Sequence, residues 1–544
     1  MTVRVLACLG LANLLLLSEW VSLYTLYRPD LAYFTDRDVP LVYLWSTVLA
    51  VMLLATAFTA GSLAIEVVAR GARTSPGRAR PALAAAAVIV LEVWLSASAR
   101  FLDPRTRAVI ALGVIVFATV WLVYVPRQST LRSASGLLAW TAVLFPVFLA
   151  TTLAGWACAT PVSPARVVDG GRARSVATRR LVWLVFDELD ERAAFGRRPS
   201  SVDLPAFDRL RRESLVATSA YAPGTWTLDA LPTLWIGRPV AEAIEQGPDA
   251  LRLTFADNDE TRVLEASATL FAQVREAGRG VGLAGWYHPY CRLFGSLANR
   301  CEANAAASGF GSFARAMLAE ELGTRSMAAR LIAWHAPWSA EGIVTGGFPR
   351  SRLNAEQGLV IRDRADTYRR LHAAALDMVV DRSLSLVFVH HVVPHLPGFY
   401  DAERGELDTS GLGDYFDNLT LADRALAEIR ASLEAADLWD RTAVIVQADH
   451  ALRPDVWIRQ RLWTTELEST TGGRQSPLVP FFVRVPGQRD GTEYGRPFNS
   501  ALAHDLALEL IDGTLDSSGD VKRWLDSNRD RLPLSWPVRT MAER

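Results

Sequence analysis

Five apolar stretches within the first 158 residues constrain the fold of this 544-residue chain more than any other feature of the sequence. A helix needs about 20 apolar residues to cross a bilayer, and each stretch is close to that length. Because such segments keep recurring and no small-residue cleavage site stands out, the pattern differs from that of a cleaved signal peptide. The sequence therefore predicts a five-helix transmembrane bundle over residues 1–160. The predicted spans are residues 5–24, 41–65, 82–98, 108–124 and 137–157.

The charges of the intervening loops predict the orientation of this bundle. Loop 66–80 contains four arginines and loop 125–134 contains two, an excess that is typical of cytoplasmic loops. Loop 25–40, with two arginines and three aspartates, is expected outside. The short loop 99–107 is assigned to the same outer side against its own charge, which is mainly basic. Five spans with an inner N-terminus place everything after residue 160 outside the cytoplasm.

The remainder of the chain alternates between strand and helix patterns. Residues 161–180 are rich in proline, glycine and arginine, which is typical of a linker. Three continuous apolar runs beyond it indicate strands that are buried on both faces, and a helical pattern over residues 418–439 directly precedes the last of them. This alternation predicts an α/β domain over residues 181–544 with a mainly parallel central sheet. The three runs are residues 181–186, 383–390 and 442–448.

Polar side chains follow each of these three predicted strands. In parallel sheets the carboxyl ends of the strands meet at one edge, so we expect these side chains to lie close together. Carboxylates and imidazoles in one place suit a divalent metal ion such as zinc or manganese. The alternative is that each Asp-His pair caps a helix and has a satisfied imidazole. The residues are Asp187, Glu188 and Asp190 after the first run, His390, His391 and His395 at the second, and Asp449 and His450 after the third.

Two cysteines lie in the part of the chain that is expected outside the cytoplasm. Cys291 and Cys301 are ten residues apart. In an oxidising compartment we expect them to form a disulfide. Two free buried thiols are the alternative.

The segment APGTWTLDALPTLWIGRP, residues 222–239, raises a chemical question. Thr225 and Thr227 flank a tryptophan, and an apolar run that ends at Gly237 follows them. One interpretation is that a threonine hydroxyl attacks a substrate from the start of a helix. The other is that Thr227 only caps that helix.

The order of these features resembles the alkaline phosphatase superfamily. More narrowly, it resembles the sulfatase-like branch that holds membrane-anchored phosphoethanolamine transferases and lipoteichoic acid synthases. The resemblance covers roughly residues 180–512. Its most specific parts are the threonine segment and the helix–strand block that ends in Asp449-His450. Five spans before an external catalytic domain are also the layout of that branch.

This resemblance implies a role for each candidate residue. Thr227 would be the nucleophile, with Thr225 as second choice, and His390 and His395 would lie beside the substrate phosphate. One divalent ion is implied, zinc or manganese first and calcium or magnesium as alternatives. A second ion is not expected, because a histidine, His391, stands where a two-metal site would need an aspartate. The implied metal ligands are Asp187 or its neighbour Glu188, together with Thr227, Asp449 and His450.

The resemblance also implies a function at the outer face of a bacterial inner membrane. We expect a metal-dependent phosphotransferase that moves a phospho-headgroup from a lipid donor to a glycan or lipid acceptor of the envelope through a phospho-threonine. The alternatives are a phosphodiesterase that releases the group to water, and a degenerate protein that only binds phosphate or glycan. The second alternative arises because Ala448 and Ala451 replace the usual serine and glycine around Asp449-His450, and no late histidine ligand is evident.

Two further classes of function are disfavoured. Sulfate-ester hydrolysis in this branch needs a cysteine or serine that can be oxidised, in a Cys/Ser-x-Pro-x-Arg setting, and the sequence from Thr227 to Leu231 offers neither. The formal net charge of −1 gives no electrostatic reason to expect a nucleic-acid partner.

Overall fold

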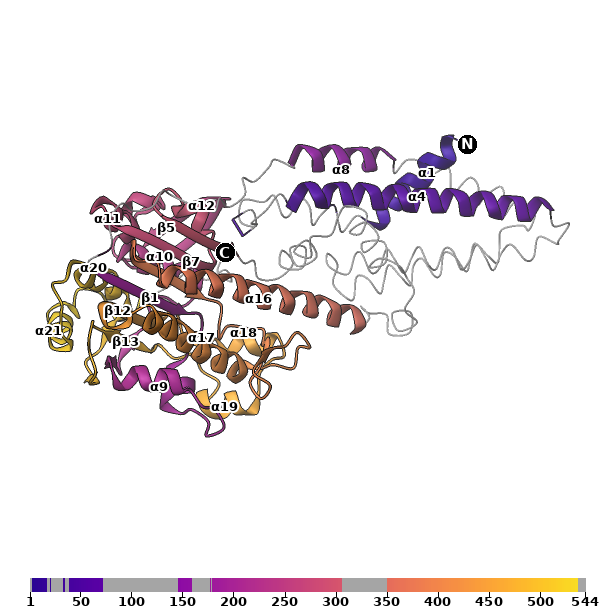
Figure 1. The fold of residues 1–544 in the computed structure, drawn as a ribbon. Coiled ribbons are helices and arrows are strands. Elements are labelled where there is room, and N and C mark those ends of the chain that lie inside the picture. Colours follow the sequence, from indigo (N-terminus) through magenta and orange to yellow (C-terminus); the bar gives the residue numbers. More distant parts are fainter. Residues whose placement is uncertain are drawn as a thin grey trace. The chain divides into compact units, whose positions relative to one another are not determined.

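The chain divides into two compact units in the computed structural model (Figure 1). The first unit comprises Met1–Arg28, Arg37–Val162 and Gly309–Gln357. The second comprises Pro29–Asp36, Ser163–Ser308 and Gly358–Arg544. We describe each unit by itself. The structure describes residues 2–16, 20, 33–34, 39–71, 145–158, 177, 179–305 and 350–536.

Three described helices overlap predicted membrane spans. They are α1 (Thr2–Leu15), α4 (Val39–Gly71) and α8 (Phe145–Cys158). Among the described residues, one stretch, Leu44–Gly61 of α4, is long and apolar enough to cross a membrane. The predicted spans at 82–98 and 108–124 lie outside the described residues, so the five-helix bundle stays a prediction.

A mixed eight-stranded sheet forms the centre of the second unit, in the order β14-β2-β13-β12-β1-β9-β7-β8. The strands β12, β1, β9, β7 and β8 are parallel to one another, and β13 is antiparallel to both of its neighbours. The prediction of an α/β domain with a mainly parallel sheet is therefore confirmed. The strands are β1 (Arg180–Phe186), β2 (Leu215–Ala217), β7 (Gly280–Tyr287), β8 (Arg300–Ala305), β9 (Leu384–His391), β12 (Thr442–Ala448), β13 (Phe481–Arg484) and β14 (Thr492–Tyr494).

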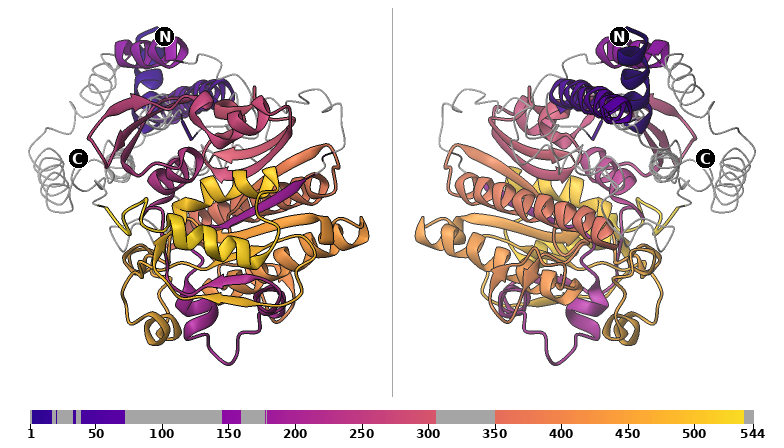
Figure 2. Two further views of the ribbon diagram at one scale, coloured as in Figure 1. Left: turned by 90° about the vertical axis from the view of Figure 1, so that its left-hand side faces the viewer. Right: turned by 90° about the vertical axis from the view of Figure 1, so that its right-hand side faces the viewer.

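Helices cover both faces of this sheet. Alternate residues of its strands point into two separate apolar cores, one on each face. In β1, for example, Val182 and Leu184 belong to one core, and Leu181 and Trp183 belong to the other. The two views of Figure 2 look at opposite faces: α20 and α21 lie in front in one, and α16 in the other. This burial on both faces explains why β1 reads as a continuous apolar run.

The helices divide between these two cores. The first core receives α9 (Pro205–Arg212), α16 (Arg350–Val379), α17 (Tyr415–Ala435), α18 (Pro454–Arg459) and α19 (Thr465–Thr471). The second core receives α10 (Thr227–Ile236), α11 (Leu270–Glu276), α12 (Tyr290–Phe294), α20 (Ala503–Asp512) and α21 (Ser518–Asn528).

Smaller sheets complete the unit. The largest is an antiparallel sheet of β4 (Val240–Gly247), β5 (Ala250–Phe255) and β6 (Thr261–Val263). The two remaining sheets are strand pairs: β10 (Tyr400–Asp401) with β11 (Glu406–Leu407), and β3 (Ala220–Tyr221) with β15 (Phe498–Asn499).

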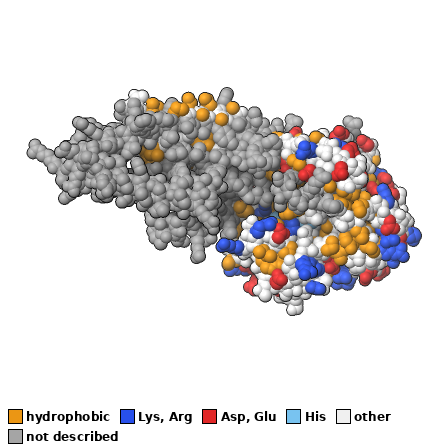
Figure 3. Space-filling view, turned by 180° about the vertical axis from the view of Figure 1, so that it is seen from behind, with side chains coloured by type: hydrophobic (Ala, Val, Ile, Leu, Met, Phe, Trp, Pro, Cys, Tyr) orange, Lys and Arg blue, Asp and Glu red, His pale blue; other side chains and the backbone are white. Residues whose placement is uncertain are grey.

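The described surface carries charges of both signs. On the face drawn in Figure 3, acidic and basic side chains of the described residues are interspersed and neither sign dominates.

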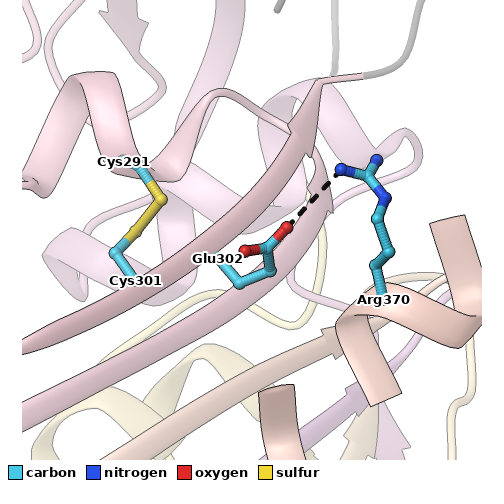
Figure 4. Close-up of a disulfide and its surroundings, with 4 residues drawn as sticks. All are labelled: Cys291, Cys301, Glu302 and Arg370. Carbon is cyan, nitrogen blue, oxygen red and sulfur yellow. Dashed lines mark ion pairs between the residues drawn. A yellow bond between two sulfur atoms is a disulfide. The ribbon is translucent and has the colours of Figure 1, made fainter. Parts of the chain in front are cut away.

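Cys291 of α12 and Cys301 of β8 form a disulfide, as Figure 4 shows. Both cysteines are buried in the second core. Glu302, the next residue, pairs with Arg370 of α16 at 3.6 Å, so β8 is tied to helices on both sides of the sheet.

Removing this disulfide should destabilise the second unit. We expect the double variant Cys291→Ser and Cys301→Ser to lower the free energy of unfolding by about 2–3 kcal/mol, because the cross-link closes a short loop and restricts the unfolded chain. Denaturant unfolding with and without reductant measures the effect. Reductant should shift the midpoint of the natural chain and leave that of the double variant unchanged. An identical midpoint for both oxidised proteins would contradict the prediction.

Candidate active site

The polar residues that follow the central strands converge because β1 lies between β12 and β9 in a parallel arrangement. Phe186, the last residue of β1, pairs with Ala448 on one side and His391 on the other. Asp187 therefore comes directly after the middle strand, and Asp449 comes directly after its neighbour. This is the edge of the sheet at which the sequence predicts a metal site.

Four side chains face one another at this edge and are all completely buried. The Nε2 atom of His450 lies 3.7 Å from Asp187 Oδ1 and 3.5 Å from Asp449 Oδ2. The Nε2 atom of His390 lies 3.6 Å from Asp187 Oδ2 and 3.9 Å from Asp449 Oδ2. Ligands that surround a zinc ion tetrahedrally at 2.0–2.2 Å lie roughly 3.4 Å apart, so these separations suit a shared divalent ion.

Three atoms of this group lack a hydrogen-bond partner in the described part of the chain. They are Asp187 Oδ1, Asp449 Oδ2 and His390 Nε2. Buried polar atoms are rarely left in this way, because the desolvation cost is not compensated. A bound cation would satisfy all three. Asp187, Asp449 and His450 also each offer one ligand atom within 4.8 Å of the others, so the donor set fits the metal ion that the sequence predicts.

Backbone carbonyls fix the tautomers of His390 and His450. His450 Nδ1 donates to the carbonyl of Ala451 at 3.0 Å, and His390 Nδ1 donates to the carbonyl of Trp286 at 3.1 Å. The lone pair of each imidazole is therefore on Nε2, which faces the carboxylates.

Burial shifts the acidity of this group in a consistent direction. It raises the pKa of Asp187 well above its usual range, and it raises that of Asp449 to about 8. It lowers the pKa of His390 to about 4 and that of His450 well below its usual range. Desolvation thus favours the neutral form of all four groups. A divalent cation reverses this preference for the two carboxylates by compensating their charge.

Thr227 brings its hydroxyl to this cluster. Its Oγ1 lies 3.3 Å from Asp187 Oδ2 and 3.1 Å from His450 Nε2, and its side chain is buried. Thr225 is exposed. The N-cap of α10 is Trp226 and Thr227 is the first helical residue, so the Thr227 hydroxyl is not used to cap the helix.

The sequence around Thr227 fixes the position of α10. The carboxylate of Asp229 turns back to accept from the Thr225 amide at 3.1 Å. A side chain at Gly224 would lie 2.4 Å from that carboxylate, and one at Gly237 would lie 2.7 Å from His504 Nδ1. Gly237 also ends the helix at a φ of 71°, which favours glycine. Close packing therefore requires glycine at both ends of α10, at Gly224 and Gly237.

The carboxylate of Glu188 has two partners outside the cluster of Asp187, His390, Asp449 and His450. Its Oε1 accepts from Arg453 Nε and its Oε2 from Trp457 Nε1, both at 2.8 Å. The Glu188 backbone has a φ of 61°, a left-handed conformation that is uncommon for residues other than glycine. The hydroxyl of Tyr415 donates to its carbonyl at 2.9 Å. Glu188 thus anchors the turn that directs Asp187 toward Asp449.

His395 is engaged within the protein at both ring nitrogens. Nδ1 donates to the carbonyl of Leu396 at 2.7 Å, and Nε2 accepts from Arg453 at 3.2 Å. Burial and the Arg453 charge lower the pKa of His395 well below its usual range. The sequence-based role of His395 in phosphate binding therefore stays a prediction, as does that of His390.

Arg453 and Trp457 are the residues of this site that the sequence did not indicate. Arg453 is buried and contacts Glu188, His395 and, at 4.4 Å, the ring of Trp226. The one signal in the sequence was the position of Arg453 four residues after Asp449. Arginine is common throughout the chain, so this signal was too weak to use.

Chemically, this arrangement can activate a hydroxyl and compensate negative charge. The Thr227 hydroxyl lies in a buried cluster of two carboxylates and two imidazoles, and the guanidinium of Arg453 is also buried at this site. Such a group suits the attack of Thr227 on an electrophilic centre with anionic oxygens.

No family model and no curated protein matches the sequence. Several solved structures are similar to it. A sulfatase from Pseudoalteromonas sp. is similar at 14% identity and a TM-score of 0.39, over 64% of this chain and 70% of that one. The phosphonate monoester hydrolase of Agrobacterium radiobacter is similar at 13% identity and a TM-score of 0.36, over 61% and 74%. A lipoteichoic acid synthase from Listeria monocytogenes is similar at 14% identity and a TM-score of 0.31, over 58% and 68%.

Proposed function

We propose that this protein is a metal-dependent phosphotransferase that uses Thr227 as its nucleophile. One observation carries the proposal: Thr227 Oγ1 lies within 3.3 Å of Asp187 and 3.1 Å of His450, at a buried group whose orphaned atoms fit a divalent ion. Thr225 does not compete for this role, because its side chain is exposed.

The proposed ligands of the ion are Asp187, Asp449, His450 and Thr227. Asp187 is preferred over Glu188 because both carboxylate oxygens of Glu188 are already held at 2.8 Å by Arg453 and Trp457. His390 Nε2 faces the same carboxylates, so it is available either to the ion or to a phosphate oxygen beside it. Zinc and manganese suit this mixture of oxygen and nitrogen donors best.

In the proposed reaction, Thr227 Oγ attacks the phosphorus of the donor in line with the leaving alcohol. A bond forms between Oγ and phosphorus, and the bond from phosphorus to the alcohol oxygen breaks. Asp187 Oδ2, 3.3 Å from the hydroxyl, receives the threonine proton, which then passes to the leaving alcohol oxygen. An acceptor hydroxyl then attacks the phospho-threonine, which restores Thr227. When bound, the divalent ion would lower the pKa of the threonine hydroxyl and compensate charge on the phosphoryl oxygens.

A lipid donor and an envelope acceptor are the proposed partners. The apolar α4 and the predicted five spans would hold the site at the outer face of an inner membrane, beside its lipids. A glycan or lipid of the envelope would then receive the phospho-headgroup.

The test uses the full chain in detergent, loaded with zinc or manganese. We expect it to cleave an aryl phosphodiester and to leave an aryl sulfate intact. Chelation should lower turnover at least a hundredfold, and added metal should restore it. Incubation with a lipid that carries a labelled phospho-headgroup should label Thr227 in the absence of acceptor.

The outcomes separate the candidate functions. Label that passes to an added glycan or lipid supports a transferase, whereas label released to water supports a phosphodiesterase of the same site. Turnover that survives complete metal removal would contradict the proposal. Metal binding without turnover of any ester or lipid would favour a protein that only binds phosphate or glycan.

A further inference from the structure

A short segment between the first two apolar stretches belongs to the same compact unit as the candidate active site. Pro29–Asp36 is grouped with the second unit, although α1 and α4 on either side of it belong to the first. Tyr33 of this segment is completely buried, and the exposed fraction of Phe34 is 6%. The sequence predicts this region as an outer loop, and nothing in its pattern indicates that it packs with the second unit.

Tyr33 and Phe34, the described residues of this segment, make apolar contacts within the second unit. Tyr33 and Phe34 share a core cluster with residues of α10, β4 and β5, and the ring of Phe34 lies edge-on to that of Tyr287 at 5.2 Å. Arg292 donates to the Tyr33 carbonyl. The apolar residues of the cluster, besides these two, are Leu228, Val240, Ala243, Leu251, Leu253 and Phe255.

A chain of two hydrogen bonds leads from Tyr33 to the backbone of Thr227. Tyr33 Oη lies 2.6 Å from His288 Nδ1, and His288 Nε2 lies 3.2 Å from the carbonyl oxygen of Thr227. All three residues are buried. A carbonyl can only accept, so His288 Nε2 carries the hydrogen and Nδ1 of the neutral ring accepts from the tyrosine hydroxyl.

The surroundings of His288 favour the neutral form of its imidazole ring. Burial lowers the pKa of His288 to about 3, and burial keeps the pKa of Tyr33 well above its usual range, so the hydroxyl retains its hydrogen. The ring of Trp235, from α10 itself, packs edge-on against His288 at 4.9 Å. His288 therefore has a fixed tautomer and a fixed orientation at the first turn of α10.

We propose that Tyr33 is a positioning residue for the Thr227 nucleophile and acts through His288. This inference rests on the function proposed above. The Tyr33 hydroxyl donates to Nδ1 and holds the His288 ring where Nε2 donates to the Thr227 carbonyl. This second bond holds the first residue of α10 in the orientation that directs Oγ1 toward Asp187. A fragment that begins after the linker would lack this hydroxyl.

The first experiment measures steady-state kinetics of the full chain and of Tyr33→Phe, which keeps the buried ring. We expect kcat to fall about tenfold while KM stays within about twofold, because the hydroxyl acts on the nucleophile and not on the substrate. Tyr494→Phe is the matched control. The Tyr494 hydroxyl is hydrogen-bonded to Asp526 at 3.1 Å, and neither residue contacts the described site. An equal loss in Tyr494→Phe, or no loss in Tyr33→Phe, would overturn the proposal.

A double-mutant cycle tests whether Tyr33 acts through His288. If it does, Tyr33→Phe should cause no further loss of kcat in a His288→Gln background. Multiplicative losses would show that Tyr33 acts independently, which would overturn the relay.

A readout that does not depend on turnover separates this inference from the proposed function. With p-azidophenylalanine in place of Phe34, illumination of the full chain should cross-link position 34 to a peptide that contains Leu251 or Leu253. Absence of this cross-link would overturn the docking of the segment. If the cross-link forms and the natural chain turns over no ester, the proposed function fails while the docked segment stands.

Discussion

Thr227→Ala is expected to lower turnover of a phosphodiester by at least about a thousandfold. The substitution removes the hydroxyl that lies beside Asp187 and His450, so the proposed phospho-threonine cannot form. Losses of this order are typical when a covalent nucleophile is deleted. Initial rates of the full chain with saturating metal measure the effect, and the metal content of both proteins must be compared.

Thr225→Ala is the matched control for this prediction. Thr225 lies two residues away in the same entry to α10, but its side chain is exposed and its role is a backbone bond to Asp229. We expect its turnover to stay within about threefold of the natural chain. A Thr227→Ala protein that binds metal and retains full turnover would exclude Thr227 as the nucleophile. A large loss in Thr225→Ala alone would transfer that role to Thr225.

The sequence was sufficient to predict the three central strands that position the site, but not the other five strands of the sheet. The runs at 181–186, 383–390 and 442–448 became β1, β9 and β12 to within one residue at each end. Burial on both faces makes such strands uniformly apolar, and polar residues can begin only where the strands end. The proximity of Asp187, His390, Asp449 and His450 follows from that topology.

The sequence could not separate Asp187 from Glu188. Both carboxylates follow β1, and a one-residue choice between them depends on the direction of a tight turn. The turn is set by the φ of 61° at Glu188 and by the side chains of Arg453 and Trp457, more than 260 residues later. Contacts over such separations leave no local pattern.

The same limit applies to Tyr33. The segment between the first two predicted spans contains Arg, Asp, Tyr and Phe, which is the composition of an ordinary connection between two helices. Its Tyr33 and Phe34 become part of the second unit because they pack against an apolar surface formed by α10, β4 and β5. Neither partner in this contact has a periodic pattern that indicates the other.

Asp187→Asn should lower the affinity for zinc by at least about a hundredfold and turnover by a similar factor. The change keeps the shape of the side chain but removes a charge from the buried cluster, in which Asp187 and Asp449 together supply the negative charge that a divalent ion needs. Competition with a chelator of known affinity measures zinc binding without reference to turnover. Unchanged zinc affinity would contradict the assignment of Asp187 as a ligand.

Glu188→Gln distinguishes a ligand from an anchor at the neighbouring position. If Glu188 only anchors the turn, the variant should bind one zinc ion with an affinity within about tenfold of the natural chain. It should nevertheless lose about 3–5 kcal/mol of unfolding free energy, because the buried Arg453 loses its counter-charge. Loss of zinc from Glu188→Gln together with its retention in Asp187→Asn would reverse the assignment. Loss of zinc from both variants with an intact fold would mean that the two adjacent carboxylates bind the ion together, which the contacts of Glu188 with Arg453 and Trp457 argue against.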